Sequence, residues 1–216
     1  MTDNKDLDPK AVVKQGYDQI AEKYLDWVKG VRVVEREQYT NILLDSLPEG
    51  SKVLELGCGA GDPTTKKLSE KFKVTGVDIS DTQIEMARKH VPNAEFIRED
   101  MTKLDFPDGS FDGVTAFYSI THISREQHPA LLNNIGKWIR PNGVLVLSMS
   151  KGSTEGMTEP WIDDRPMYFS GFDPETNKKL VQDAGLEIVS AREETDLEFG
   201  QPTTFLWVVA RKSSSA

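Results

Sequence analysis

A glycine-rich turn between a short apolar run and a helical pattern is the feature that most constrains this chain. The apolar run 53–56 leads into Gly57, Gly59 and Gly61. Glycines let the backbone turn tightly and let a ligand approach the main chain, and a following helix offers unpaired N–H groups. Asp78 ends the next apolar run, about where a carboxylate accepts the hydroxyls of a ribose. A structural turn with Asp78 as a cap is the alternative, but the combination within one strand–helix–strand unit favours nucleoside binding.

Strand and helix patterns alternate along the chain, which is typical of a mostly parallel sheet with helices on both faces. We expect helices at 11–27, 32–47, 81–90, 125–138 and 173–184. We expect strands at 52–56, 73–77, 94–98, 111–117, 144–149, 186–191 and 203–211. A further helix is expected to start at Asp62-Pro63, with Asp62 as its N-cap. The segment 150–172 is long for a connection and is predicted to be a functional loop insertion.

The charge balance argues against a nucleic-acid partner. The chain has 26 Lys+Arg against 35 Asp+Glu, a net charge of -9, which repels a phosphate backbone unless a basic patch overrides it. The densest basic pairs, Lys66-Lys67 and Lys178-Lys179, fit the exposed faces of helices. We therefore expect no contact with nucleic acid.

Cysteine content and hydropathy bear on the compartment. Cys58 is the only cysteine, which excludes an intrachain disulfide and fits a reducing compartment. Residues 1–10 lack the apolar region of a secretory signal, and no apolar run approaches the roughly 18–20 residues of a membrane span. We expect a cytoplasmic protein that does not engage a membrane.

The glycine spacing distinguishes two classes of nucleoside-binding protein. A dinucleotide fingerprint, G-x-G-x-x-G, would place its third glycine at Asp62, whereas this chain has G-x-G-x-G. With Glu55 before it, the run resembles motif I of the class I S-adenosylmethionine (SAM)-dependent methyltransferases. Later segments resemble that family's other motifs: Val77-Asp78-Ile79-Ser80, Glu99-Asp100-Met101, 106–112 and Arg140-Pro141-Asn142-Gly143-Val144-Leu145. From about Tyr17 onwards, the chain is identified as a member of the UbiE-like, small-molecule branch (methyltransferase type 11).

The resemblance implies an α/β fold, the Rossmann-like methyltransferase fold. It implies a seven-stranded, mostly parallel sheet of order 3-2-1-4-5-7-6, with the last strand antiparallel and helices on both faces. We expect one domain over 1–216, in which residues 1–47 form a helical cap over the cofactor and 150–172 lie on the acceptor side.

The resemblance also assigns residues to SAM. They are Tyr17, Tyr24, Glu55, Gly57, Cys58, Gly59, Asp78, Ile79, Asp100, Met101, Phe117 and Tyr118. Glu55 and the glycine turn would hold the methionine end, Asp78 the ribose, and Asp100 the adenine amino group. Core packing is the alternative for Ile79, Met101 and Phe117, and an amphipathic packing helix is the alternative for the two N-terminal tyrosines.

The acceptor side has two candidates. His122 follows the fourth strand at the carboxyl edge, where open α/β sheets bind ligands, so it is a candidate base or substrate contact, with a structural role as the alternative. The aromatic and acidic segment 159–169 would line an acceptor pocket. The alternative is that its aromatic side chains only pack against the edge of the sheet. The residues expected at this wall are Trp27, Arg32, Trp161, Tyr168 and Phe169.

The sequence thus predicts methyl transfer from SAM to an O, N or S atom of a small-molecule acceptor, without a metal. One alternative is an NAD(P)-dependent oxidoreductase, which the glycine spacing opposes. The other is a non-catalytic SAM-binding protein.

Overall fold

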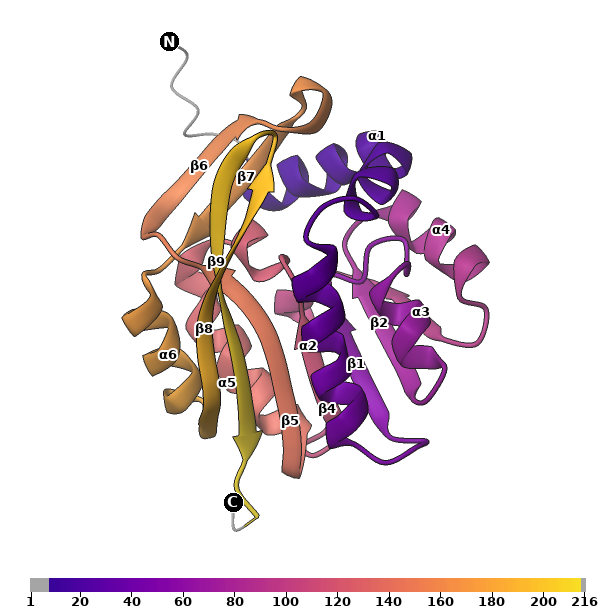
Figure 1. The fold of residues 1–216 in the computed structure, drawn as a ribbon, viewed down its shortest axis with the longest axis vertical. Helices are drawn as coiled ribbons and strands as arrows, with labels where there is room; N and C mark the ends of the chain where they lie inside the picture. Colours follow the sequence, from indigo (N-terminus) through magenta and orange to yellow (C-terminus); the bar gives the residue numbers. More distant parts are fainter. Residues whose placement is uncertain (1–7, 215–216) are drawn as a thin grey trace.

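The apolar runs of the sequence form the centre of a seven-stranded sheet in the computed structural model, which describes residues 8–214 (Figure 1). The strands in chain order are β1 (Lys52–Leu56), β2 (Lys73–Asp78), β3 (Glu95–Arg98), β4 (Phe111–Ala116), β5 (Ile139–Ser150), β8 (Leu186–Glu198) and β9 (Gln201–Lys212). They lie in the order β3-β2-β1-β4-β5-β9-β8, and β9 is antiparallel to both of its neighbours. Counted within this sheet, the order is the predicted 3-2-1-4-5-7-6, so the predicted Rossmann-like α/β fold is confirmed. Residues 1–7 lie outside the residues that the structure describes. They belong to the predicted helical cap and to the N-terminal stretch that lacks the apolar region of a secretory signal.

Helices cover both faces of the sheet, because the central strands carry apolar side chains on both of their faces. The helices are α1 (Pro9–Val28), α2 (Val33–Ser46), α3 (Thr64–Ser69), α4 (Asp81–His90), α5 (His128–Trp138) and α6 (Pro174–Asp183). In β5, Val144 and Val146 belong to the core formed with α2 and α3, whereas Leu145 and Leu147 belong to the core formed with α5 and α6. This two-sided burial explains why β5 is a continuous apolar run.

The N-terminal segment has two separate structural roles. α1 lies over the carboxyl edge of the sheet, where Val12, Val13 and Ile20 pack against a two-stranded hairpin (Figure 1). α2 instead packs on a sheet face, where Tyr39 stacks on Trp207 of β9 with ring centroids 4.1 Å apart. α1 therefore covers the carboxyl edge and α2 does not, and the expected role of residues 1–47 as a cap over the cofactor stays a prediction.

The segment 150–172 is a β-hairpin and not the loop that the sequence predicted. β6 (Thr154–Pro160) and β7 (Pro166–Gly171) pair antiparallel, joined by a short turn that includes the 3-10 helix η4 (Ile162–Asp164). Gly, Pro and acidic residues have low strand propensity, so the sequence pattern did not predict this hairpin. The strands tolerate them because β6 is largely exposed and only β7 buries apolar side chains, Met167 and Tyr168.

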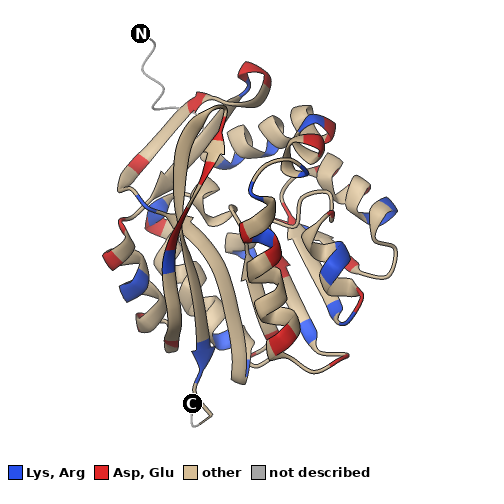
Figure 2. Ribbon diagram, in the orientation of Figure 1, with Lys and Arg blue, Asp and Glu red and all other residues tan. Residues whose placement is uncertain are grey.

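β8 and β9 extend beyond the sheet as a long ribbon, which the predicted strands 186–191 and 203–211 missed. The pairing of β9 with β5 extends only as far as Phe205, whereas its pairing with β8 extends beyond that residue to the turn at Phe199-Gly200. Both turn residues have positive φ, 50° and 76°, as a type I′ hairpin turn requires. Acidic residues along this ribbon (red in Figure 2) have low strand propensity and concealed it.

Arg32 ties the ribbon to the corner between α1 and α2. Its guanidinium donates to the Glu198 carboxylate and, at 3.0 Å, to the Thr203 carbonyl, and its backbone N–H donates to Asp196 at 2.7 Å. The ribbon is therefore held over the same edge of the sheet as α1.

One local expectation was wrong. α3 begins at Thr64, and Asp62 does not cap it but lies 3.6 Å from the Lys66 ammonium. His128, the first residue of α5, is buried and packs edge-on against Phe172.

Charges of both signs are interspersed over the helices (Figure 2). The lysines of the densest basic pairs have acidic neighbours: Lys67 lies 3.2 Å from Glu37 and Lys179 lies 2.7 Å from Asp183. Within residues 8–214, no helix combines the length and apolar character needed to cross a membrane.

Candidate active site

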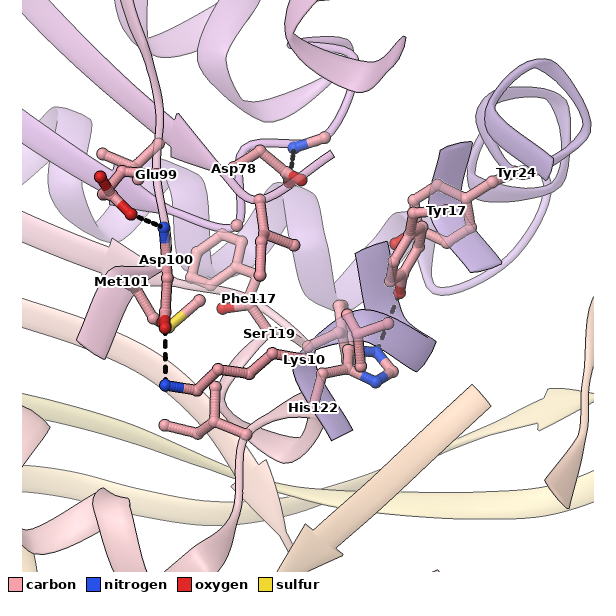
Figure 3. A pocket seen from close by; sticks show the side chains of 17 residues that line it. Lys10, Tyr17, Tyr24, Asp78, Glu99, Asp100, Met101, Phe117, Ser119 and His122 are labelled. Atoms are coloured by element: carbon pink, nitrogen blue, oxygen red, sulfur yellow. Dashed lines mark hydrogen bonds and ion pairs between the residues drawn. The ribbon is translucent and has the colours of Figure 1, made fainter. Parts of the chain in front are cut away.

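A cavity lies beneath α1 at the carboxyl ends of β1, β2 and β4 (Figure 3). We call it the cap cavity; its lining includes Tyr17, Gly57, Asp78, Asp100, Phe117 and His122. Parallel strands deliver their carboxyl ends to one edge, so residues from separate motifs converge there.

Asp78 joins the end of β2 to the glycine turn after β1. Its Oδ2 accepts from the Gly59 N–H and its Oδ1 from the Ser80 N–H, each at 2.9 Å. Burial raises the pKa of Asp78 to about 6, although the backbone hydrogen bonds oppose the rise. A carboxylate has about four acceptor sites, so Asp78 retains capacity for donors from a ligand.

Asp100 closes the opposite end of the cap cavity. It caps the 3-10 helix η1 (Met101–Lys103), and its Oδ1 accepts from the Thr102 N–H at 2.9 Å. Its Oδ2 lies 2.6 Å from the Lys10 ammonium of α1 (Figure 3). Burial alone would raise the pKa of Asp100, but hydrogen bonds from Lys10 and Thr102 outweigh it and lower the pKa. Lys10 is a site residue that sequence reasoning missed, because nothing in the pattern of α1 marks which lysine faces Asp100.

A second cavity lies on the other side of the glycine turn. We call it the glycine-turn cavity; Arg36, Glu55, Cys58 and Thr64 line it, and it shares Tyr24, Gly57, Gly59 and Phe117 with the cap cavity. Glu55 accepts from the Thr65 hydroxyl at 2.5 Å, and burial raises its pKa to about 8. The Glu55 carboxyl is therefore mostly protonated at pH 7 until a cation comes beside it.

A third cavity lies between α1, the β6–β7 hairpin and the β8–β9 ribbon, and we call it the ribbon cavity. Aromatic side chains dominate its wall: Trp27, Trp161, Phe169, Phe199 and Phe205. Trp161 packs edge-on against Trp27 with ring centroids 5.5 Å apart. Pockets with an apolar wall and a few polar groups are typical binding sites for small molecules.

The cap cavity and the ribbon cavity share Tyr17, Tyr24, Tyr118 and His122. The His122 Nδ1 lies 2.9 Å from the Tyr168 carbonyl, which can only accept, so Nδ1 carries the proton. Its Nε2, 2.8 Å from the Tyr17 hydroxyl, therefore accepts from that hydroxyl (Figure 3). Burial lowers the pKa of His122 to about 4, so the ring is neutral at pH 7.

Tyr118 forms the floor between these cavities in an unusual backbone conformation. Its φ is 57°, in the left-handed region that non-glycine residues rarely adopt, and its N–H donates to the Ser148 hydroxyl at 2.7 Å. The guanidinium carbons of Arg36 and Arg32 lie 4.8 and 5.2 Å from the centre of its ring. Strained residues of this kind concentrate at functional sites.

The structure brings together nearly all the residues singled out from the sequence. Every residue that the resemblance assigned to SAM lines the cap cavity or the glycine-turn cavity. Trp27, Arg32, Trp161, Phe169 and His122 line the ribbon cavity. Tyr168 lines none of the three cavities and reaches the site only through its carbonyl. Sequence reasoning missed Lys10, Arg36, Thr64, Phe199 and Phe205, which topology alone brings to the site.

Comparison with known proteins identifies the family of the chain. Residues 53–143 match the family described as "Methyltransferase domain". The chain is 32% identical over 161 residues to phosphoethanolamine N-methyltransferase 3 of Arabidopsis thaliana, covering 71% of this chain and 32% of that protein. It is 29% identical over 170 residues to 2-methyl-6-phytyl-1,4-hydroquinone methyltransferase of Synechocystis, covering 77% of this chain and 52% of that protein.

Among solved structures, the fold resembles 1,6-didemethyltoxoflavin-N1-methyltransferase of Burkholderia thailandensis, with a TM-score of 0.72 at 20% sequence identity, over 94% of this chain and 88% of that one. That structure holds 1,6-didemethyltoxoflavin and S-adenosylhomocysteine. The chain belongs to the class I SAM-dependent methyltransferases. It spans about a third to a half of the length of the two relatives that it matches in sequence.

The glycine turn yields a direct test of its packing. In Gly57→Ala the new Cβ would lie 2.3 Å from the Ser119 Cβ at a φ of 76°, whereas in Gly59→Ala it would find no atom within 3.7 Å at a φ of 54°. Both changes cost about 1–2 kcal/mol for the left-handed backbone, and only Gly57→Ala adds about 1–3 kcal/mol of overpacking. Urea unfolding should show the larger loss for Gly57→Ala; equal losses would mean that Ser119 does not confine the turn.

Proposed function

We propose that this protein transfers a methyl group from SAM to an O, N or S atom of a small molecule bound in the ribbon cavity. The observation that carries the proposal is the shared wall of Tyr17, Tyr24, Tyr118 and His122, where a cavity with nucleoside-binding residues adjoins a second, aromatic cavity. Methyl transfer needs the donor and the acceptor in line and close together, and adjoining cavities supply that arrangement.

The residues of the cap and glycine-turn cavities suit SAM. Asp78 offers carboxylate lone pairs for ribose hydroxyls, Ile79 and Phe117 offer apolar surface, and Asp100 offers an acceptor at the far end. The glycine-turn cavity combines Glu55 with Arg36, groups that complement an amino acid's ammonium and carboxylate. When bound, SAM supplies a sulfonium-activated methyl group.

The chain's own residues would position the acceptor and handle its proton. A hydroxyl acceptor must lose its proton to become a good nucleophile. Tyr17 can receive that proton on its hydroxyl oxygen while passing its own proton to His122 Nε2, 2.8 Å away. With a pKa of about 4, His122 holds a proton poorly at pH 7, so we assign the pair to orienting the acceptor and relaying a proton.

The acceptor class follows from the wall of the ribbon cavity. Aromatic rings on the hairpin and the ribbon favour a flat or apolar molecule, and polar groups near the junction would orient it. The relatives named above act, by their names, on phosphoethanolamine, a hydroquinone and 1,6-didemethyltoxoflavin, which supports a small-molecule acceptor.

The partners and location proposed from the sequence remain the same. We infer a cytoplasmic protein from its single, buried cysteine. We infer no nucleic-acid or membrane partner from the net charge of -9 and from the interspersed charges (Figure 2).

A cofactor panel followed by turnover tests the proposed function. At a hundred times its dissociation constant, a ligand of the native state adds about 2.7 kcal/mol of stability, so SAM and S-adenosylhomocysteine should raise the melting temperature and NAD should not. A screen of phenols, thiols, amines and carboxylic acids should then reveal acceptor-dependent formation of S-adenosylhomocysteine. A shift with NAD alone would indicate an oxidoreductase, and SAM binding without turnover of any acceptor class would indicate a binding protein.

The proton relay predicts specific losses with an acceptor found by that screen. His122→Asn and Tyr17→Phe should each lower kcat about a hundredfold, as loss of a positioned proton-transfer group does. Because the pKa of His122 is about 4, neutral His122 persists down to that value, and the acid limb of the wild-type profile should lie below pH 5. Tyr168→Phe keeps the carbonyl that holds His122 and should leave kcat unchanged. An acid limb near pH 6.5, or parental kcat in both relay variants, would contradict this assignment.

A further inference from the structure

Three hydrogen-bond donors beside the ribbon cavity lack acceptors. They are the Arg32 Nη1, the Arg36 Nε and the Tyr118 hydroxyl, each fully buried and without a hydrogen bond in the described part of the chain. The three residues line the ribbon cavity and are only 2%, 9% and 9% exposed. Native proteins pair nearly all of their buried polar groups, so three unpaired donors in one place indicate an acceptor that arrives with a ligand.

The three donors surround a single aromatic ring. The guanidinium carbons of Arg36 and Arg32 lie 4.8 and 5.2 Å from the centre of the Tyr118 ring. A ring face lowers the cost of burying a positive charge, but it does not replace a hydrogen-bond acceptor. Burial raises the pKa of Tyr118, so its hydroxyl keeps its proton. Even a bond from Arg32 to the Tyr118 oxygen would leave that hydroxyl hydrogen without an acceptor.

The carboxylates of the protein do not satisfy these donors. Glu198 accepts from the Arg32 Nε, and a backbone carbonyl accepts from its Nη2 at 3.0 Å, so Nη1 is left over. Within residues 8–214, Arg36 forms no ion pair, although Glu35 on the same helix is buried. Glu159, the other carboxylate of the cavity lining, is exposed on the hairpin strand β6.

A carboxylate is the group that such donors complement. It carries two acceptor oxygens, which can take a guanidinium nitrogen and a hydroxyl together. Arg36 also lines the glycine-turn cavity, where its charge complements SAM, whereas Arg32 and Tyr118 do not line that cavity. The donors of Arg32 and Tyr118 are therefore the ones that a ligand of the ribbon cavity can use.

We propose that the methyl acceptor is an aromatic or apolar molecule that carries a carboxylate, and that Arg32 and Tyr118 bind this carboxylate. The inference rests on the proposed function, which places the acceptor in the ribbon cavity. The aromatic wall holds the body of the molecule, and the carboxylate fixes it beside the Tyr118 ring. The carboxylate is the recognition group, and another O, N or S atom of the acceptor receives the methyl group.

A subsite of this kind selects the acceptor by charge and not by shape. A carboxylic acid and its primary amide are nearly identical in shape, but only the ionised acid offers a negative charge and two acceptor oxygens. A residue that binds the carboxylate must discriminate between the two compounds. A residue that only anchors the ribbon, as Arg32 does through Glu198, must affect both of them equally.

Matched pairs of probes test the proposal on the full chain saturated with S-adenosylhomocysteine. The carboxylates are 4-hydroxybenzoate, 4-hydroxycinnamate and 6-hydroxy-2-naphthoate, and each is compared with its primary amide. Quenching of tryptophan fluorescence reports binding, because Trp27 and Trp161 line the ribbon cavity. At least one carboxylate should bind about tenfold or more tightly than its amide, and turnover with SAM should show the same preference.

Two variants assign that preference to the proposed residues. Tyr118→Phe keeps the ring without the hydroxyl, and Arg32→Lys keeps a charge without the guanidinium fork. Each should weaken the carboxylate about fivefold or more and leave the amide within about twofold of wild type. The matched controls are Tyr39→Phe, at a buried tyrosine outside the three cavities, and Arg88→Lys, at an exposed arginine of α4. Both should leave the preference unchanged.

The remaining outcomes separate this proposal from the proposed function. The proposal is overturned if no carboxylate binds more tightly than its amide, or if Tyr118→Phe weakens both probes equally. It is also overturned if either variant weakens S-adenosylhomocysteine more than the carboxylate, because the donors would then serve the cofactor. Where Arg32→Lys weakens both probes through loss of the ribbon, Tyr118→Phe decides. A wild-type protein that binds no S-adenosylhomocysteine would reject the proposed function, whereas turnover of neutral and anionic acceptors alike would reject only this inference.

Discussion

The hydrogen bond from the Gly59 N–H to the Asp78 carboxylate is the contact on which the site depends. It ties the turn after β1 to the end of β2, two neighbouring parallel strands, at 2.9 Å. The turn can approach Asp78 because its glycines adopt positive φ, and Ser119 leaves no room for a side chain at Gly57. One face of the turn then borders the cap cavity and the other borders the glycine-turn cavity, so this short segment separates the two cavities.

Elements outside the central sheet cover this edge and divide it further. α1 is held down by polar contacts at both ends of the cap cavity, through Lys10 on Asp100 and through Asp18 on the Ser80 hydroxyl. The β6–β7 hairpin and the β8–β9 ribbon form the remaining wall, and Arg32 fastens the ribbon to the α1–α2 corner. The carboxyl edge of the central sheet and α1 thus border the cap cavity, and α1, the hairpin and the ribbon border the ribbon cavity. The hairpin and the ribbon can therefore change without altering the lining of the cap cavity, which fits a fold that serves many substrates.

The sequence predicted where the glycine turn and Asp78 lie because their signals are local. The glycines, Glu55 and Asp78 stand within one strand–helix–strand unit, and the carboxyl edge follows from parallel pairing. The elements around the ribbon cavity were harder to predict, because acidic residues, Gly and Pro have low strand propensity and make up much of the hairpin and the ribbon extension. Lys10 and Arg36 could not be recognised at all, since the partner of Lys10 lies some 90 residues away, at Asp100 and Thr102, and a buried helical arginine reads as exposed until the fold is known.

A crystal structure with S-adenosylhomocysteine tests the central claim most directly. We expect the ribose hydroxyls on the Asp78 carboxylate, the adenine at the Asp100 end of the cap cavity, and the sulfur at the wall shared with the ribbon cavity, near Tyr17 and His122. The ribbon cavity should stay free for the acceptor. Density for the ligand in the ribbon cavity, or a ribose that makes no contact with Asp78, would contradict the account.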